Sequence, residues 1–390
     1  MKRNQIYTGI IVFVCCVLVA IGVTLRLLNH ADKLPVKVPV LVNRQKPQVA
    51  DTLKKKPVAK PDFRISGTLK DTEGRGVAGV IVSDGFNCVK TDSHGRYKMK
   101  RDSLARFIYY SVPADCEVPT HSATDRTAYF YQTISKKKKI YNFTLRRLPG
   151  GKETHYKMIV IGDPQVTNAY SPYYTSPDDN PIKKSDVERF TTQTMADIKQ
   201  TIKSLPAGTP VYGLSMGDDV QYYGGYNARL ERQIRQALGS SEMRLFSVIG
   251  NHDQDGKALY RRKWDENFGP TDFSFNRGDV HYVCINNCFF HRGMAYYSPG
   301  ELRERQVKWL KQDLALTPKD MKVVLCYHIP FTFGNAPFSK AKPLINANEQ
   351  GHYSSSRLSL LLSLLKPFKG GYELFCGHTH FACNHEINYQ

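Results

Sequence analysis

From about residue 153 to its end, the chain alternates apolar runs of strand length with segments of helical period. The strand candidates are residues 155–162, 210–216, 244–250, 322–327 and 372–376, and the helix candidates are residues 185–204, 226–238, 301–315 and 353–366. An apolar antiparallel pair at residues 272–287 lies between them. This alternation with mixed strand direction predicts a layered α/β (α+β) sandwich, in which helices flank mixed β-sheets.

A short polar motif follows each of the five strand candidates. The motifs read GDPQ, MGDD, GNHD, YHIP and GHTH, and they carry Asp163, Gln165, Asp218, Asp219, Asn251, His252, Asp253, His328, His378 and His380. Ligands of open α/β sheets gather beyond the carboxyl ends of the strands, so the five loops should converge on one crevice. One motif alone is more often a turn cap or a core histidine. Together, the aspartates, histidines and amides fit a pair of divalent transition metals.

The order D-x-Q, GD, GNHD, H and GHxH resembles that of the calcineurin-like metallophosphoesterases, over residues 153–390. The runs SFNRGDVHYVCINN and RQVKWLKQDL look like the central hairpin and following helix of that family. The resemblance implies a phosphoester hydrolase with a dinuclear metal site and a bridging hydroxide as nucleophile. It assigns Asp163, Gln165 and His380 to the first metal, Asn251, His328 and His378 to the second, and Asp218 to both. It also implies that His252 assists the phosphoryl oxygens or the leaving group, with Asp253 as its orienting partner or as a loop cap.

Two positions depart from the family pattern. Gln165 stands where many members carry His, and a neutral amide oxygen is a harder ligand than imidazole. Among manganese, iron, zinc and magnesium, this favours the harder ions over zinc. Gln221 stands where some members carry an Asp that orients the catalytic His, or a Tyr that binds ferric iron. A tyrosinate-bound iron site is therefore disfavoured.

The N-terminus carries an apolar stretch without charge at residues 9–25, after Lys2 and Arg3. Its 17 residues lie at the lower limit for a membrane span. We expect residues 1–28 to be an uncleaved membrane anchor, with a cleaved signal or a lipoprotein as alternatives, and residues 29–61 to be a Lys/Pro-rich linker. The arrangement resembles envelope members of the family from gut-type bacteria. We therefore expect an exported, membrane-anchored protein in the periplasm or on the surface.

Residues 62–149 show short alternating segments divided by turns, which predicts a small all-β sandwich. The runs GTLKDTEGRGVAGVIVSDG and TDSHGRY resemble the carboxypeptidase-regulatory-like sandwich, which implies a spacer or a binding module. Cys88 and Cys116 could form a disulfide there, and buried thiol roles are the alternative.

Positive charge concentrates toward the N-terminus. The formal net charge is +20, of which residues 1–60 carry +9, residues 61–150 carry +7 and the remainder only +4. This distribution favours an anionic membrane surface as a partner over nucleic acid. It says little about the substrate of the catalytic part, and the oligomeric state is not predicted.

Other readings of the function stay open. A pyrophosphohydrolase that acts on nucleotide diphosphate conjugates is one, and a non-catalytic surface binding protein is another. The substrate would be a small-molecule or envelope phosphoester. The aromatic runs at residues 169–176 and 221–226 could line the crevice or cover a sheet edge. Because family members normally continue with another strand, we expect residues 153–390 to be truncated at the C-terminus.

Overall fold

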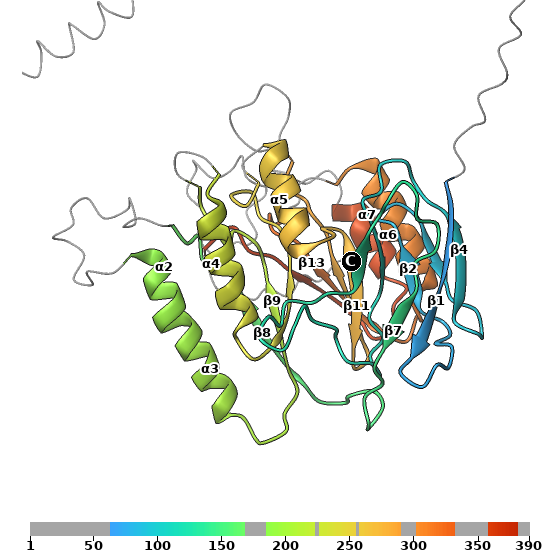
Figure 1. Cartoon of the computed structure of the whole chain (residues 1–390), viewed down its shortest axis with the longest axis horizontal. Helices are drawn as coiled ribbons and strands as arrows, with labels where there is room; N and C mark the ends of the chain where they lie inside the picture. Colours follow the sequence, from blue (N-terminus) through green and yellow to red (C-terminus); the bar gives the residue numbers. More distant parts are fainter. Residues whose placement is uncertain are drawn as a thin grey trace, which may run out of the picture. The chain divides into compact units, whose positions relative to one another are not determined.

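The computed structural model describes residues 63–167, 185–222, 226–254, 257–289, 302–331 and 358–380. All of them belong to one compact unit that begins at Pro61. In Figure 1 the helices α2, α3 and α4 lie beside the strands β8 and β9, and the strands β1 and β4 lie at the opposite side of this unit. No described helix is both long and apolar enough to cross a membrane, and the predicted span at residues 9–25 lies outside the described chain.

The N-terminal part is built from two small β-sheets. The first has the order β4-β1-β7 and contains β1 (Arg64–Asp71), β4 (Arg96–Lys100) and β7 (Phe143–Leu145). The second has the order β3-β2-β5-β6 and contains β2 (Ile81–Ser83), β3 (Cys88–Lys90), β5 (Phe107–Tyr110) and β6 (Tyr131–Thr133). The expected β-rich segment is thus present. Cys88 and Cys116 are free thiols, so the disulfide considered above is not formed.

Two further sheets form the part that carries the polar motifs. One is wholly parallel, has the order β10-β9-β8 and contains β8 (Lys157–Ile161), β9 (Val211–Ser215) and β10 (Arg244–Ser247). The other has the order β11-β12-β13-β14 and contains β11 (Phe273–Arg277), β12 (Val280–Cys284), β13 (Lys322–Cys326) and β14 (Tyr372–Phe375). The pair β11–β12 is antiparallel, and β12, β13 and β14 run parallel. The mixed sheets confirm the predicted fold class.

Helices cover both of these sheets. They are α2 (Asp186–Arg189), the π-helical turn η2 (Phe190–Thr194), α3 (Met195–Ser204), α4 (Ala228–Gly239), α5 (Ala258–Phe268), α6 (Glu304–Leu316) and α7 (Leu358–Leu365). Leu230 and Ile234 of α4 pack with Ile161 and Leu245, whereas α6 and α7 bury their apolar faces against β12 and β13. Helix α5 was not predicted. Its signal is the spacing of its buried aromatic residues, Tyr260, Trp264 and Phe268, four positions apart.

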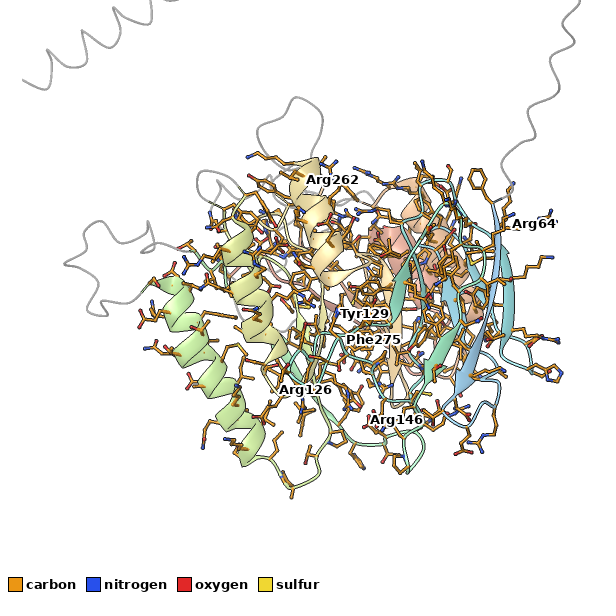
Figure 2. All side chains as sticks on the ribbon, in the orientation of Figure 1. Arg64, Arg126, Tyr129, Arg146, Arg262 and Phe275 are labelled. Carbon is orange, nitrogen blue, oxygen red and sulfur yellow. The ribbon has the colours of Figure 1, made fainter. Side chains whose placement is uncertain are left out.

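The two parts share one hydrophobic core. Phe130 of the N-terminal part packs against Phe246 and Phe273, with ring centroids 5.8 Å and 5.0 Å apart. Val112 forms a parallel bridge with Phe275, which lies inside the fold (Figure 2). A separate spacer would keep a core of its own, so this shared packing speaks against that alternative for residues 62–149, and the binding module stays a prediction.

Buried polar contacts join the same two parts. The guanidinium of Arg277 is fully buried and donates hydrogen bonds to the carbonyls of Pro113 and Cys116. Trp309 of α6 donates to the hydroxyl of Ser83 over 2.9 Å. Buried donors and acceptors of this kind are costly to separate, so the β-rich part is fixed on the part that carries the motifs.

Candidate metal centre

The five polar motifs come together at the ends of β8, β9, β10, β13 and β14. The Nε2 atom of His328 lies 3.1 Å from Asp218 Oδ2 and 3.8 Å from Asp163 Oδ1. His380 Nε2 lies 3.7 Å from Asp163 Oδ1. The parallel order of the strands explains this meeting, because their carboxyl ends share one edge of each sheet.

The remaining predicted ligands join the same group. Asn251 Oδ1 lies 3.0 Å from His328 Nε2, and Gln165 Nε2 lies 3.5 Å from Asp218 Oδ2. One ligand atom from each of Asp218, His328 and His378 lies within 4.8 Å of the others. All seven residues predicted as ligands are therefore neighbours, and their roles as ligands stay a prediction.

The backbone is strained at most of these positions. Six non-glycine residues of the described chain have a positive φ, and five of them are predicted ligands: Asp163 (46°), Gln165 (42°), Asp218 (55°), His378 (72°) and His380 (55°). This region costs a residue with a side chain about 1–2 kcal/mol. Strained conformations persist only where the surroundings hold them in place, and they cluster at functional sites.

Two glycines of the motifs allow the loops to approach closely. A Cβ atom on Gly250 would lie 2.0 Å from Asp218 Oδ1, and one on Gly377 would lie 2.5 Å from Asp163 Oδ2. Any side chain at these positions would displace a predicted ligand. The glycines of GNHD and GHTH are thus required by the packing of the site.

His328 is oriented for a metal ion. Its Nδ1 lies 2.8 Å from the carbonyl oxygen of Met216, so Nδ1 carries the proton and donates it there. The lone pair of Nε2 then faces Asn251 Oδ1 and Asp218 Oδ2, which also present lone pairs. Three such atoms repel one another unless a cation or a proton lies among them. The donor set of imidazole, carboxylate and amide oxygen therefore fits a divalent metal.

The closeness of His328 to Asp218 and Asp163 shifts the pKa values of these groups. Burial alone would lower the pKa of His328, but the carboxylates of Asp218 and Asp163 raise it to about 9. Burial alone would raise the pKa of Asp218, but His328 holds it below its usual range. Burial dominates at Asp163, whose pKa is raised. A cation that enters the site would compete with the proton on His328.

His252 lies beside this group and is partly exposed. Its backbone N–H donates to Asp218 Oδ1 over 2.8 Å. Asp253 is buried, and its carboxylate accepts from the backbone N–H groups of Asp218 (2.9 Å), Gly250 (2.8 Å) and Val220 (3.2 Å). These contacts correspond to the loop-cap alternative for Asp253. A role in orienting His252 stays a prediction.

One residue that supports the site was missed by the sequence reasoning. Asn287 is fully buried and follows β12, at the end of the run CINN. Its Oδ1 accepts from the backbone N–H groups of His328 (3.2 Å) and Ile329 (3.0 Å), and its Nδ2 donates to the carbonyl of Ile329. The signal was the pair of asparagines at a strand end, where neighbouring loops carry ligands.

The described tyrosines near the site pack on one another. Tyr222 is buried, and its ring lies 5.4 Å from that of Tyr226 and 5.1 Å from that of Tyr260. In the run at residues 221–226, Tyr222 and Tyr226 thus have a packing role. Residues 169–176 and 223–225 lie outside the described chain.

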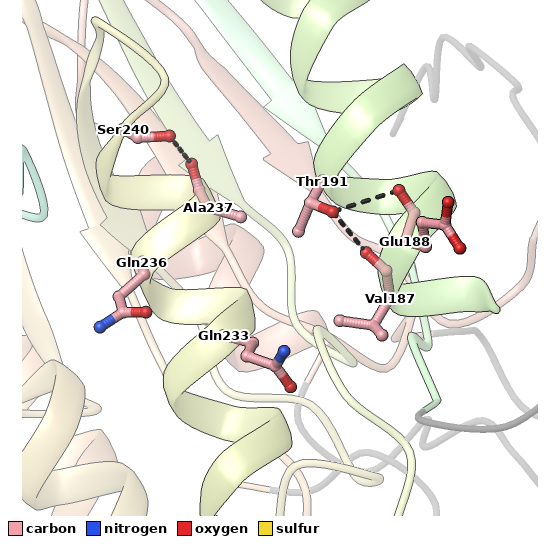
Figure 3. Close-up of a pocket in the computed structure, with 7 residues that line it drawn as sticks. All are labelled: Val187, Glu188, Thr191, Gln233, Gln236, Ala237 and Ser240. Carbon is pink, nitrogen blue, oxygen red and sulfur yellow. Dashed lines mark hydrogen bonds between the residues drawn. The ribbon is translucent and has the colours of Figure 1, made fainter. Parts of the chain in front are cut away.

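A shallow pocket of about 490 Å³ lies elsewhere, between α2–η2 and α4 (Figure 3). It is lined by Val187, Glu188, Thr191, Gln233, Gln236, Ala237 and Ser240. None of the predicted site residues lines it. The pocket therefore does not belong to the candidate metal centre. Within it, the hydroxyl of Thr191 donates to the backbone carbonyls of Val187 and Glu188.

Comparisons with known proteins bear on the whole described chain. The family model for the calcineurin-like phosphoesterase matches residues 156–382, and the model for the N-terminal domain of calcineurin-like phosphoesterases matches residues 63–148. Among solved structures, a purple acid phosphatase from yellow lupin (Lupinus luteus) seeds is similar at 14% identity and a TM-score of 0.31. That similarity covers 67% of this chain and 48% of the lupin chain. No curated protein sequence matches.

The two family matches confirm the family that the five motifs predicted, and this family of phosphoesterases agrees with the enzyme class expected from the sequence. The larger match includes every predicted ligand, from Asp163 to His380. The chain belongs to the calcineurin-like phosphoesterase family.

Proposed function

We propose that this protein hydrolyses phosphoesters with two divalent metal ions held by the candidate metal centre. The family implies divalent metal cofactors, and the arrangement of donor atoms supports their place. Asp163, Gln165 and His380 would hold one ion, and Asn251, His328 and His378 the other, with Asp218 shared between them. When bound, the ions would activate water as a hydroxide and neutralise the phosphoryl oxygens.

The observation that carries this proposal is the group around His328. Its Nε2 faces two oxygen acceptors at 3.0 Å and 3.1 Å, while its Nδ1 is occupied by the carbonyl of Met216. A histidine held in this way has a fixed tautomer and a fixed ring, which is how proteins orient metal ligands. Its full burial keeps water from competing for the lone pair.

His252 is the residue best placed to act on the substrate itself. Its backbone is tied to Asp218, and its side chain stays partly open to solvent. An imidazole beside the shared carboxylate can donate a proton to the leaving alkoxide or a hydrogen bond to a phosphoryl oxygen. Such a donor contributes about 10²–10⁴-fold to the rate of a hydrolytic reaction.

The test compares three variants with Mn²⁺ added: Asp218→Asn, His252→Ala and, as a matched control, His94→Ala, whose side chain is exposed in a turn of the β-rich part. The assays are hydrolysis of a chromogenic phosphomonoester, a phosphodiester and a nucleoside diphosphate conjugate, together with metal content by mass spectrometry.

We expect Asp218→Asn to lose metal and activity, His252→Ala to keep metal and lose about 10²–10⁴-fold in kcat, and His94→Ala to match wild type. Preference for the diphosphate conjugate would favour the pyrophosphohydrolase alternative. Wild-type activity in all three variants would refute the proposed site. No metal binding and no hydrolysis by the wild type would refute the proposed function and favour the non-catalytic surface binding protein.

A further inference from the structure

The outward face of the β4-β1-β7 sheet carries only basic charge. Its exposed charged side chains are Arg64 and Lys70 on β1, and Arg96, Lys98 and Lys100 on β4. The alternating neighbours of these residues, such as Ile65, Leu69, Tyr97 and Met99, are buried in the core. No acidic side chain of the three strands points outward, since Asp71 is buried. We call these five residues the basic face.

Strand register brings like charges together on this face. Arg64 lies directly opposite Lys100, and Ser66 lies opposite Lys98. Like charges opposite each other destabilise a sheet. Arg96 is paired with Asp92 at 2.9 Å, but no ion pair in the described chain reaches Lys70, Lys98 or Lys100. These three lysines are therefore the groups that an external anionic partner would pair with.

A structural reason for lysines on a sheet is protection of its edge. Strand β4 is an edge strand, and edge lysines prevent pairing with other chains. Strand β1, however, is paired on both sides at Lys70, with Thr144 of β7 and with Gly76, so edge protection does not explain Lys70. Protection of the edge therefore accounts for only part of the basic face.

Two exposed apolar side chains lie in segments that follow or pair with the strands of the basic face. Leu104 is 64% exposed in the turn after β4, and Ile140 is 58% exposed where it bridges to Ser66. The four consecutive lysines at positions 136–139 are also exposed and directly precede Ile140. Basic residues with single apolar side chains at the same surface are typical of proteins that rest on anionic lipid.

The order of the chain points to the same partner. Residues 1–60 carry a net charge of +9 and include the apolar stretch at residues 9–25, and β1 starts at Arg64. Figure 2 shows Arg64 at the outer side of the unit, beside β4. A face joined to a membrane-inserted segment by a linker would meet the bilayer at a raised effective concentration.

We propose that the basic face docks on the surface of an anionic phospholipid bilayer. The charges of the face match the lipid headgroups, and Leu104 and Ile140 contact the interface. Each basic residue near such a surface strengthens binding about 5-fold, and salt screens the effect. Docking would hold the unit in one orientation on the membrane.

The experiment uses the full chain on vesicles of phosphatidylcholine alone and on vesicles with about 30% phosphatidylglycerol. Lysines are acetylated briefly and the modification of each is measured by mass spectrometry. We expect Lys98 and Lys100 to react about 3-fold or more slowly on the anionic vesicles, and about 1 M NaCl to remove the difference. Lys203, exposed on α3, is the internal control and should react equally on both.

A charge-reversal pair provides the second measurement. The double variant Lys98→Glu/Lys100→Glu should lose the protection of Lys70 on anionic vesicles, whereas Lys203→Glu should retain it. Equal acetylation on both vesicle types, or no association of the chain with vesicles, would overturn the proposal. Protection by a soluble anionic polysaccharide without protection by vesicles would overturn it as well, in favour of a polymer ligand.

Discussion

Asn287 offers the sharpest test of how the candidate metal centre is held together. The substitution Asn287→Ala removes an amide that is fully buried and does not belong to the predicted ligands. The backbone N–H groups of His328 and Ile329 would lose their acceptor, and the carbonyl of Ile329 would lose its donor. No solvent reaches these groups readily, because His328 and Ile329 are themselves buried.

The expected loss of stability follows from this count. A buried polar group without a partner costs about 1–3 kcal/mol. The two N–H groups of this loop share one acceptor, so we count two lost interactions and expect a loss of about 2–6 kcal/mol in the free energy of unfolding. A domain of about 10 kcal/mol, in the middle of the ordinary range, would remain folded. Loss of a residue that orients a metal ligand lowers metal affinity by about 10–100-fold.

Urea unfolding without metal measures the first quantity, and calorimetric titration with Mn²⁺ measures the second. Asn142→Ala is the control, because Asn142 also accepts from a backbone N–H, that of Thr68, but on the surface. It should lose about 1 kcal/mol or less and keep its metal affinity. A loss below about 1 kcal/mol for Asn287→Ala would refute the count of interactions. Unchanged Mn²⁺ affinity would refute its role in positioning His328.

Three further predictions concern other parts of the molecule. Arg277→Met should lower the free energy of unfolding, measured in urea, by about 3–5 kcal/mol, because the carbonyls of Pro113 and Cys116 would lose their buried donor. Arg262→Met, at an exposed position, is the control and should change it by less than about 0.5 kcal/mol. Gln165→His should keep activity and shift the metal content toward zinc, measured by mass spectrometry after competitive loading, and loss of all metal would contradict its place as a ligand. Lys100→Glu should raise the free energy of unfolding by about 0.2–1 kcal/mol, since it replaces a like-charge pair with Arg64 by an opposite one, and a lower value would show that the register does not bring the two charges together.

The sequence predicted the strands and the convergence of the motifs well. An apolar run of strand length predicts the strand, and the polar residue after its carboxyl end predicts where a site residue lies, as at Ile161 before Asp163 and at Cys326 before His328. The parallel order of such strands then leaves little freedom in where their ends meet. The ligand group could be predicted for this reason before any distance was known.

Contacts between segments far apart in the sequence could not be predicted in the same way. Arg277 reads as an ordinary charge at the end of a hairpin, yet it is buried among carbonyls of the β-rich part, more than 160 positions away. Asn287 carries no motif, and its role depends on a loop that starts about 40 positions later. The roles of such side chains depend on tertiary contacts, which local sequence patterns do not specify.

The backbone of the candidate metal centre depends both on the local motifs and on contacts between distant segments. Asp163, Asp218 and His378 all have a positive φ. A glycine at each of these positions would adopt that conformation at less cost. Selection for stability alone would place glycine at those positions. A charged or imidazole side chain at these positions points in a fixed direction. The surrounding hydrogen bonds, such as those that the Asp253 carboxylate accepts from the backbone N–H groups of Asp218 and Gly250, hold the strained loops in place. The candidate metal centre is thus the region where the fold gives up stability for the direction of the predicted ligands.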